Sequence, residues 1–156
     1  MARSVPWLSR DEFWSAIEEC RQISLDCESF AERLVAHLSS WGFAKLAAFH
    51  NTMWYDVSVF HRGTLWNLVY QQEPLLGSQN AWECYGGWLI AQGREYHESV
   101  MRDPALALTR LPTWQEIDAG ETVIFSAQEA CLRKTGRRYN LYDVIGDFLP
   151  AEAFSR

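Results

Sequence analysis

The amino-acid sequence predicts an all-α protein, a compact bundle of about five to seven helices of ordinary length. Three observations support this fold class. Apolar residues recur at steps of three and four in successive segments, which is the spacing of one face of an α-helix. Residues that cap helices stand before these segments, and glycine or proline follows them. The alternating pattern typical of strands is nearly absent.

The predicted helices start at capping residues and stop at helix breakers. Ser9 and Glu12 have the spacing of a capping box. Thr113 and Glu116, just after Pro112, form a second start of the same kind. The other starts are expected at Asp26, Phe43, Thr64 and Asp103, and the ends at Gly42, Gly63, Gly120 and Gly136. The third of these helices keeps its register as far as His61.

The longest predicted helix, near 80–102, is the central one around which the others are expected to pack. Asn80 is its expected N-cap, with Glu83 three residues later. Its end is expected at the pair Asp103-Pro104, because proline disfavours helix in the residue before it. One face of this helix is formed by Ala81, Tyr85, Trp88, Leu89, Gln92, Tyr96 and Val100.

Three glycines interrupt this helix, namely Gly86, Gly87 and Gly93. Each costs a helix up to about 1 kcal/mol relative to alanine. Close packing against another helix usually offsets such a cost, and we predict it at Gly87 and Gly93. The alternatives are a kink, or a backbone surface left open for a ligand.

Length and cysteine usage favour one cytoplasmic domain. A chain of 156 residues has the usual size of a single domain. Residues 1–156 are therefore expected to form one globular helical unit, with an arm at 1–8 and a tail at 139–156 that is either a short helix or extended. The opening MARSVPWLSR lacks the apolar core of a secretion signal. No CxxC pair occurs, so free thiols in a reducing compartment are expected at Cys20, Cys27, Cys84 and Cys131.

The charge balance argues against nucleic acid as the main ligand. The net charge is −6 and the pI is near 5.2, whereas proteins that bind phosphate backbones carry a basic surface. The basic cluster of Arg133-Lys134 and Arg137-Arg138 suits the negative end of a helix dipole. No apolar stretch has the length of a membrane span, so we expect neither nucleic acid nor membrane as a partner.

The histidines do not have the spacing of metal ligands. His50 and His61 share a predicted helix face but are eleven residues apart, about 16 Å at about 1.5 Å per residue. His97 lacks the second histidine of an HExxH zinc site, and its neighbour Glu98 has instead the i,i+4 spacing of an ion pair with Arg94. No GxSxG turn or glycine-rich phosphate loop occurs. We expect no metal, no cofactor and no catalytic residue.

An aromatic group in the middle of the chain allows two interpretations. Eight tryptophans are many for this length, and they either fill the core or line a ligand pocket. Glu83 either caps a helix or faces a cleft, where burial would raise its pKa toward acid–base use. The candidate binding residues are Trp54, Trp66, Trp82, Glu83, Tyr85, Trp88 and His50.

Several short motifs of this sequence occur together in one known family. They are Phe13-Trp14-x-x-Ile17, Leu65-Trp66, Gly77-Ser78, and the block WLIAQGR from Trp88 to Arg94, followed by Asp103-Pro104. In this order and spacing they resemble the bacterial family called domain of unknown function 4240, over about residues 9–135. The pattern WLIxxGR is the most specific part of the resemblance.

The chain departs from that family at two places. Its members carry a Ser-Asp-Asp turn before the signature helix and an arginine two residues before its tryptophan. Ser78 is present here, but Gln79-Asn80 replaces the acidic pair and Gly86 stands at the arginine position. If the family's charged groups form a polar or metal site, the resemblance implies that this chain has lost them, which argues against an inherited enzyme activity.

Two functional hypotheses follow. The first is a non-catalytic protein-binding module of the immunity or regulatory type, whose acidic surface steers a basic partner. The second is a small-molecule-binding protein or enzyme with a tryptophan-lined pocket near Glu83. A solid core with an exposed apolar patch favours the first. A cavity into which Glu83 or His50 points favours the second.

Overall fold

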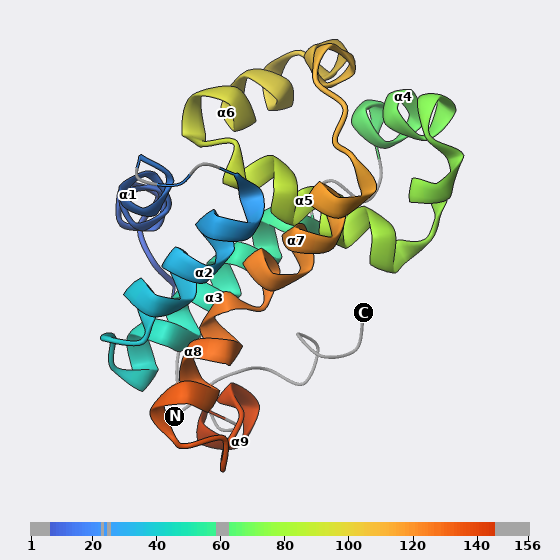
Figure 1. The fold of residues 1–156 in the computed structure, drawn as a ribbon. Helices are drawn as coiled ribbons and strands as arrows, with labels where there is room; N and C mark the ends of the chain where they lie inside the picture. The colour runs from blue at the N-terminus through green and yellow to red at the C-terminus, as the bar shows by residue number, and fades with distance from the viewer. Residues whose placement is uncertain (1–6, 23, 25, 59–62, 146–156) are drawn as a thin grey trace, which may run out of the picture.

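The structure, a computed structural model, describes residues 7–22, 24, 26–58 and 63–145, and it confirms the all-α prediction. Within these ranges the chain forms nine α-helices and two short 3-10 helices, η2 and η3, and no strand (Figure 1). Their bounds are α1 Arg10–Arg21, α2 Cys27–Leu38, α3 Phe43–Ser58, α4 Thr64–Gln72, η2 Pro74–Gly77, α5 Gln79–Ala91, α6 Arg94–Arg102, η3 Pro104–Thr109, α7 Trp114–Ile124, α8 Ser126–Lys134 and α9 Leu141–Ile145.

The buried apolar side chains fall into two clusters, and α5 and α7 contribute to both. The first cluster lies mainly among α1, α2, α3 and α8 and includes Trp14 and Phe49. The second lies among α4, α5, α6, α7 and the two 3-10 helices and includes Trp82 and Tyr85. Figure 1 shows α4 and α6 at the end of the molecule opposite α8 and α9.

The crossing of α5 and α7 brings two backbones into direct contact. A Cβ atom at Gly87 would overlap the carbonyl oxygen of Gly120, and a Cβ atom at Gly120 would overlap that of Cys84. The close packing predicted at Gly87 is confirmed. Gly120 was expected to end a helix, but it lies inside α7, because the close crossing requires a residue without a side chain there.

The range 80–102, predicted as one continuous helix, is divided between α5 and α6. Gly93 separates the two helices with φ +99°, a backbone conformation that side chains disfavour and glycine adopts freely. Gly93 therefore marks a break between two helices, and the close packing predicted there is also present, because a Cβ atom at Gly93 would lie 2.7 Å from Glu18 Oε1 of α1. The N-cap of α5 is Ser78, not Asn80, and its side chain accepts a hydrogen bond from the amide of Ala81 at 3.2 Å.

Most of the other predicted helix ends agree with the structure. Thr113 and Glu116 form the predicted capping box, and Asp26 caps α2. α2 ends at Leu38, before the expected stop, and the tail forms a short helix at α9. No helix in the described ranges is long and apolar enough to cross a membrane. Parts of three predictions lie outside the described residues: the arm at 1–6, the third helix at 59–62 and the tail at 146–156.

Candidate functional site

The block WLIAQGR ends at a contact between α6 and α1. Because Gly93 precedes α6, this helix has no side-chain cap of its own. The amide of Arg94 instead donates a hydrogen bond to Glu18 Oε1 at 2.8 Å, so a carboxylate of α1 caps α6 and faces the positive end of its dipole. A Cβ atom at Gly93 would lie 2.7 Å from the same oxygen. Glycine is needed here for space as well as for conformation.

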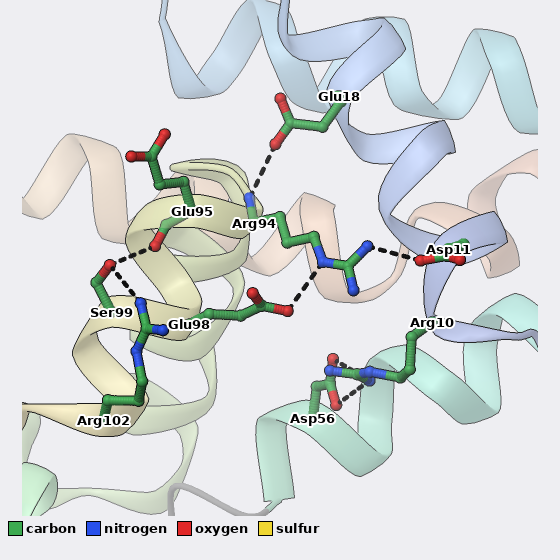
Figure 2. A network of polar contacts seen from close by, with 9 residues as sticks. All are labelled: Arg10, Asp11, Glu18, Asp56, Arg94, Glu95, Glu98, Ser99 and Arg102. Carbon is green, nitrogen blue, oxygen red and sulfur yellow. Dashed lines mark hydrogen bonds and ion pairs between the residues drawn. The ribbon is translucent and has the colours of Figure 1, made fainter.

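The side chain of Arg94 joins the two helices a second time (Figure 2). Its Nη1 donates to Asp11 Oδ1 at 2.8 Å and its Nε to Glu98 Oε1 at 2.8 Å, which confirms the predicted i,i+4 pair. The hydrogen bond to Asp11 and then that to Glu98 raise the pKa of Arg94, and its guanidinium lowers the pKa of Glu98. The Asp11 side chain is 89% exposed, so water screens its ion pair with Arg94 and the pair contributes little to stability.

A second ion pair ties α1 to α3. Arg10 Nη1 lies 2.7 Å and 2.9 Å from the two carboxylate oxygens of Asp56, as Figure 2 shows. Asp56 is 3% exposed, and burial raises its pKa, while the hydrogen bond from Arg10 and its charge act in the opposite direction. Arg10 therefore supplies the compensation that a buried carboxylate requires.

Two aromatic rings meet between α1 and α6. The ring centroids of Trp14 and His97 are 5.0 Å apart, and the two residues are 1% and 3% exposed. Burial lowers the pKa of His97 to about 4, and the charge of Arg10 acts in the same direction. The imidazole is therefore neutral at neutral pH.

Sequence reasoning missed most of this α1–α6 cluster. Asp11 and Glu18 have the positions of ordinary solvated charges on α1, and they meet Arg94 across 83 and 76 residues of chain. No local pattern indicates such a contact. The single usable signal was the spacing of Arg94 and Glu98, which lie on one helix.

The structure brings together three of the predicted binding residues. Trp82, Tyr85 and Trp88 follow one another on α5, with successive ring centroids 4.9 Å and 5.7 Å apart. They are 0–2% exposed and belong to the second core cluster. The hydroxyl of Tyr85 is buried with no hydrogen-bond partner in the described part of the chain, and burial raises its pKa.

The remaining candidates lie apart from that group or on its edge. Trp66 stacks on Tyr70 of α4, with centroids 4.8 Å apart. Trp54 lies on α3 in the first cluster, with its ring centroid 5.5 Å from that of Phe125. His50 also lies on α3, with its ring centroid 6.1 Å from that of Trp54. Burial lowers the pKa of His50 to about 4.

Glu83 is half-buried on α5 and accepts a hydrogen bond from Gln79 Nε2 at 3.1 Å. Because Ser78 is the N-cap of α5, Glu83 does not stand at the capping-box position predicted for it relative to Asn80. A shallow depression of about 280 Å³ lies elsewhere, where α7 meets α8, and its lining residues are Phe125, Gln128, Glu129 and Leu132.

The thiols of this chain are poor nucleophiles at neutral pH. Burial raises the pKa of Cys27 to about 12 and those of Cys20 and Cys84 to about 11, whereas a reactive cysteine has a lowered pKa. In the ranges that the structure describes, no three side chains of His, Cys, Asp or Glu group so as to hold a metal ion.

Comparison with known proteins gives one result. The family model of the proteins of unknown function called DUF4240 matches residues 8–133. No curated protein and no solved structure gives a significant match. The matched range contains the α1–α6 cluster around Arg94, the aromatic group of α5 and the glycine crossing of α5 with α7. The chain therefore belongs to the DUF4240 family.

Proposed function

We propose that this chain is a non-catalytic protein-binding module of the immunity or regulatory type, with a basic partner. The observation that carries the proposal is the exposure of bulky apolar side chains at one end of the molecule. Leu75 is 67% exposed, Leu111 47% and Trp114 40%. Single exposed apolar residues are ordinary, but several in one region are typical of interaction sites.

The charge distribution supports a basic partner. Residues 63–121 contain three arginines and eight aspartates or glutamates, so five of the six net negative charges of the chain fall in this segment. The exposed apolar side chains belong to the same segment. A negative field of this kind speeds the encounter with a basic protein and weakens as salt rises.

In this proposal the cluster around Arg94 has a structural role. Glu18 and Asp11 of α1 hold the start of α6, and α6 packs against η3. These contacts keep the apolar end of the molecule in a fixed orientation relative to α1. Rigid positioning of this kind lowers the entropy that binding costs.

The test is a pull-down with the tagged full chain from the lysate of its native cell, followed by mass spectrometry at two salt concentrations. We expect a stoichiometric protein partner of high pI whose retention falls as salt rises. Capture of no protein at either salt concentration would contradict the proposal. An acidic partner whose retention does not depend on salt would contradict the electrostatic part of it.

A small-molecule site at Trp82, Tyr85 and Trp88 is the second candidate. The Tyr85 hydroxyl favours it, because a buried polar group without a partner costs about 1–3 kcal/mol, and a polar atom of a ligand would satisfy it. Trp66 packs against the same core cluster as these three residues, and Glu83 lies on the same helix, α5. Trp54 and His50 lie on α3, away from this group. Native mass spectrometry tests this candidate: a bound compound released on denaturation, and lost in Tyr85→Phe, is expected. Absence of any bound compound would count against it.

A further inference from the structure

Six bulky side chains make up what we call the apolar face: Tyr70, Leu75, Met101, Leu106, Leu111 and Trp114. They are 37–67% exposed and come from α4, η2, the end of α6, η3, the segment that leads into α7, and the first residue of α7. α4 packs against both 3-10 helices, and α6 packs against η3. α4, α6 and the two 3-10 helices therefore adjoin one another, at the end of the molecule that Figure 1 shows around α4 and α6, and residues 110–113 lead from η3 into α7.

The elements of the apolar face bury some of their apolar side chains and expose others. The same elements already bury apolar side chains in the second core cluster, and Val69, Leu76 and Ala107 are at most 1% exposed. In η2 the contrast is between neighbours, since Leu76 is buried while Leu75 is 67% exposed. Removal of a large apolar side chain from water makes a favourable hydrophobic contribution. The apolar face gains that contribution only when another molecule covers it.

Contacts within the chain hold parts of the apolar face in place. The ring of Tyr70 stacks on that of Trp66 at 4.8 Å with 5° between their planes. It also lies against η2, since a Cβ atom at Gly77 would be 2.6 Å from its Cε2. On η3, the carbonyl oxygen of Leu106 accepts a hydrogen bond of 3.4 Å from the hydroxyl of Tyr96. A surface ordered before binding loses less entropy on binding.

Carboxylates border the apolar face. Asp103 directly follows α6, and Asp118 stands one helical turn after Trp114 on α7, on the same side of the helix; both are exposed. Arg102, the exposed residue between Met101 and Asp103, donates a hydrogen bond of 3.4 Å to Ser99 Oγ on its own helix. The nearby Arg110 is engaged within the chain, with its guanidinium 4.5 Å above a tyrosine ring. A second copy of the chain would bring like charges together here, so the charge argues against self-association and for a basic partner.

We propose that the apolar face is the docking surface for a protein partner that presents arginine side chains among apolar ones. Guanidinium groups stack on aromatic rings and pair with carboxylates, and Tyr70, Trp114 and Asp118 offer both. Apolar side chains of the partner cover Leu75 and Leu111. This assignment rests on the proposed function and specifies its surface and the chemistry of its partner.

The probe is a fluorescent synthetic peptide in which leucines and arginines recur with helical spacing, and its counterpart carries glutamate in place of arginine. We expect the arginine peptide to bind the full chain in an anisotropy titration and the glutamate peptide not to bind. The double variant Leu75→Ser/Leu111→Ser is expected to bind at least about tenfold more weakly, which is typical of the loss of central apolar contacts. Tyr70→Ser is expected to weaken binding in the same sense.

Tyr55→Ser is the matched control, since Tyr55 is 56% exposed on α3, outside the apolar face. It is expected to leave the affinity unchanged, and circular dichroism checks that every variant is folded. Equal affinity of the wild type and the double variant would overturn the inference, as would binding of the glutamate peptide or a dimer that the double variant abolishes. A lysate partner still held by the double variant would overturn the surface assignment alone, whereas a wild-type chain that captures no protein would overturn the proposed function.

Discussion

Replacing Gly120 with alanine is expected to destabilise the protein through the crossing of α5 and α7. The added Cβ atom would overlap the carbonyl oxygen of Cys84 and lie 2.9 Å from the backbone nitrogen of Trp88. Neither obstacle is the end of a flexible side chain, so the helices themselves must separate. The contact that they would loosen is the most extensive one between helices of the described chain.

The expected net loss is about 2 kcal/mol. Overpacking of a well-packed site costs about 1–3 kcal/mol, and the obstruction by backbone on α5 places Gly120→Ala at the upper end of that range. The better helix propensity of alanine returns at most about 1 kcal/mol. For a chain of 156 residues, about 2 kcal/mol corresponds to a fall in Tm of about 4–8 °C.

Denaturant unfolding followed by circular dichroism measures this loss. Glu121→Ala is the matched control, because Glu121 is the exposed neighbour of Gly120 on α7, and its effect on the free energy of unfolding should stay within about 0.5 kcal/mol. A Gly120→Ala variant as stable as the wild type would refute the close approach of the two backbones.

Three further predictions concern the contacts of α1 and the buried histidines. Glu18→Ala removes the cap of α6 and should lower the local stability of its first turn by about 1 kcal/mol, which speeds amide exchange there. Unchanged protection of this turn in a hydrogen–deuterium exchange experiment would contradict the prediction. Arg10→Ala should raise the pKa of Asp56 further, and an NMR titration of the Asp56 carboxyl carbon would show this. It should also lower the free energy of unfolding by about 1–3 kcal/mol. This loss is smaller than for a fully buried ion pair, because the Arg10 side chain is 48% exposed. The pKa values of His50 and His97 in the folded protein are about 4, below the ordinary 6.5. The stability that each neutral histidine contributes is therefore fully present above pH 6.5 and is lost as the pH falls toward 4. The loss is on the order of 3 kcal/mol for each histidine. His97→Gln should flatten this part of the plot of unfolding free energy against pH, and an unchanged slope would argue against the shift.

The sequence predicted those features that depend on neighbours along the chain. The capping box of Thr113 and Glu116 and the ion pair of Arg94 and Glu98 are local, and both are confirmed. The all-α class follows from periodicity in the same way. Such features need no knowledge of which helices touch.

The division of the predicted central helix was beyond local reasoning. Gly93 adopts its positive φ next to Glu18, a residue of α1 that lies 76 positions before Arg94. Gly120 looked like a helix stop because glycine has a low helix propensity, but it is retained inside α7 by the contact with α5. In both cases a tertiary contact overrides the local preference of the residue.

The candidate site shows the same limit. The sequence analysis named Trp82, Tyr85 and Trp88 among seven candidate binding residues, but spacing does not distinguish a packed core from a lined pocket. In the structure these three rings pack in the second core cluster. The apolar face escaped detection because Leu75 and Leu76 are adjacent and chemically identical. Only the packing of η2 on α4 and α5 decides which of the two is exposed.

The most direct test of the proposed binding function is hydrogen–deuterium exchange of the full chain, alone and in complex with the protein that it captures from its native lysate. New protection concentrated in residues 64–77 and 101–114, with little change in α8 and α9, is the result that we predict. Protection centred on α8 and α9, or no change at the apolar face, would contradict the account.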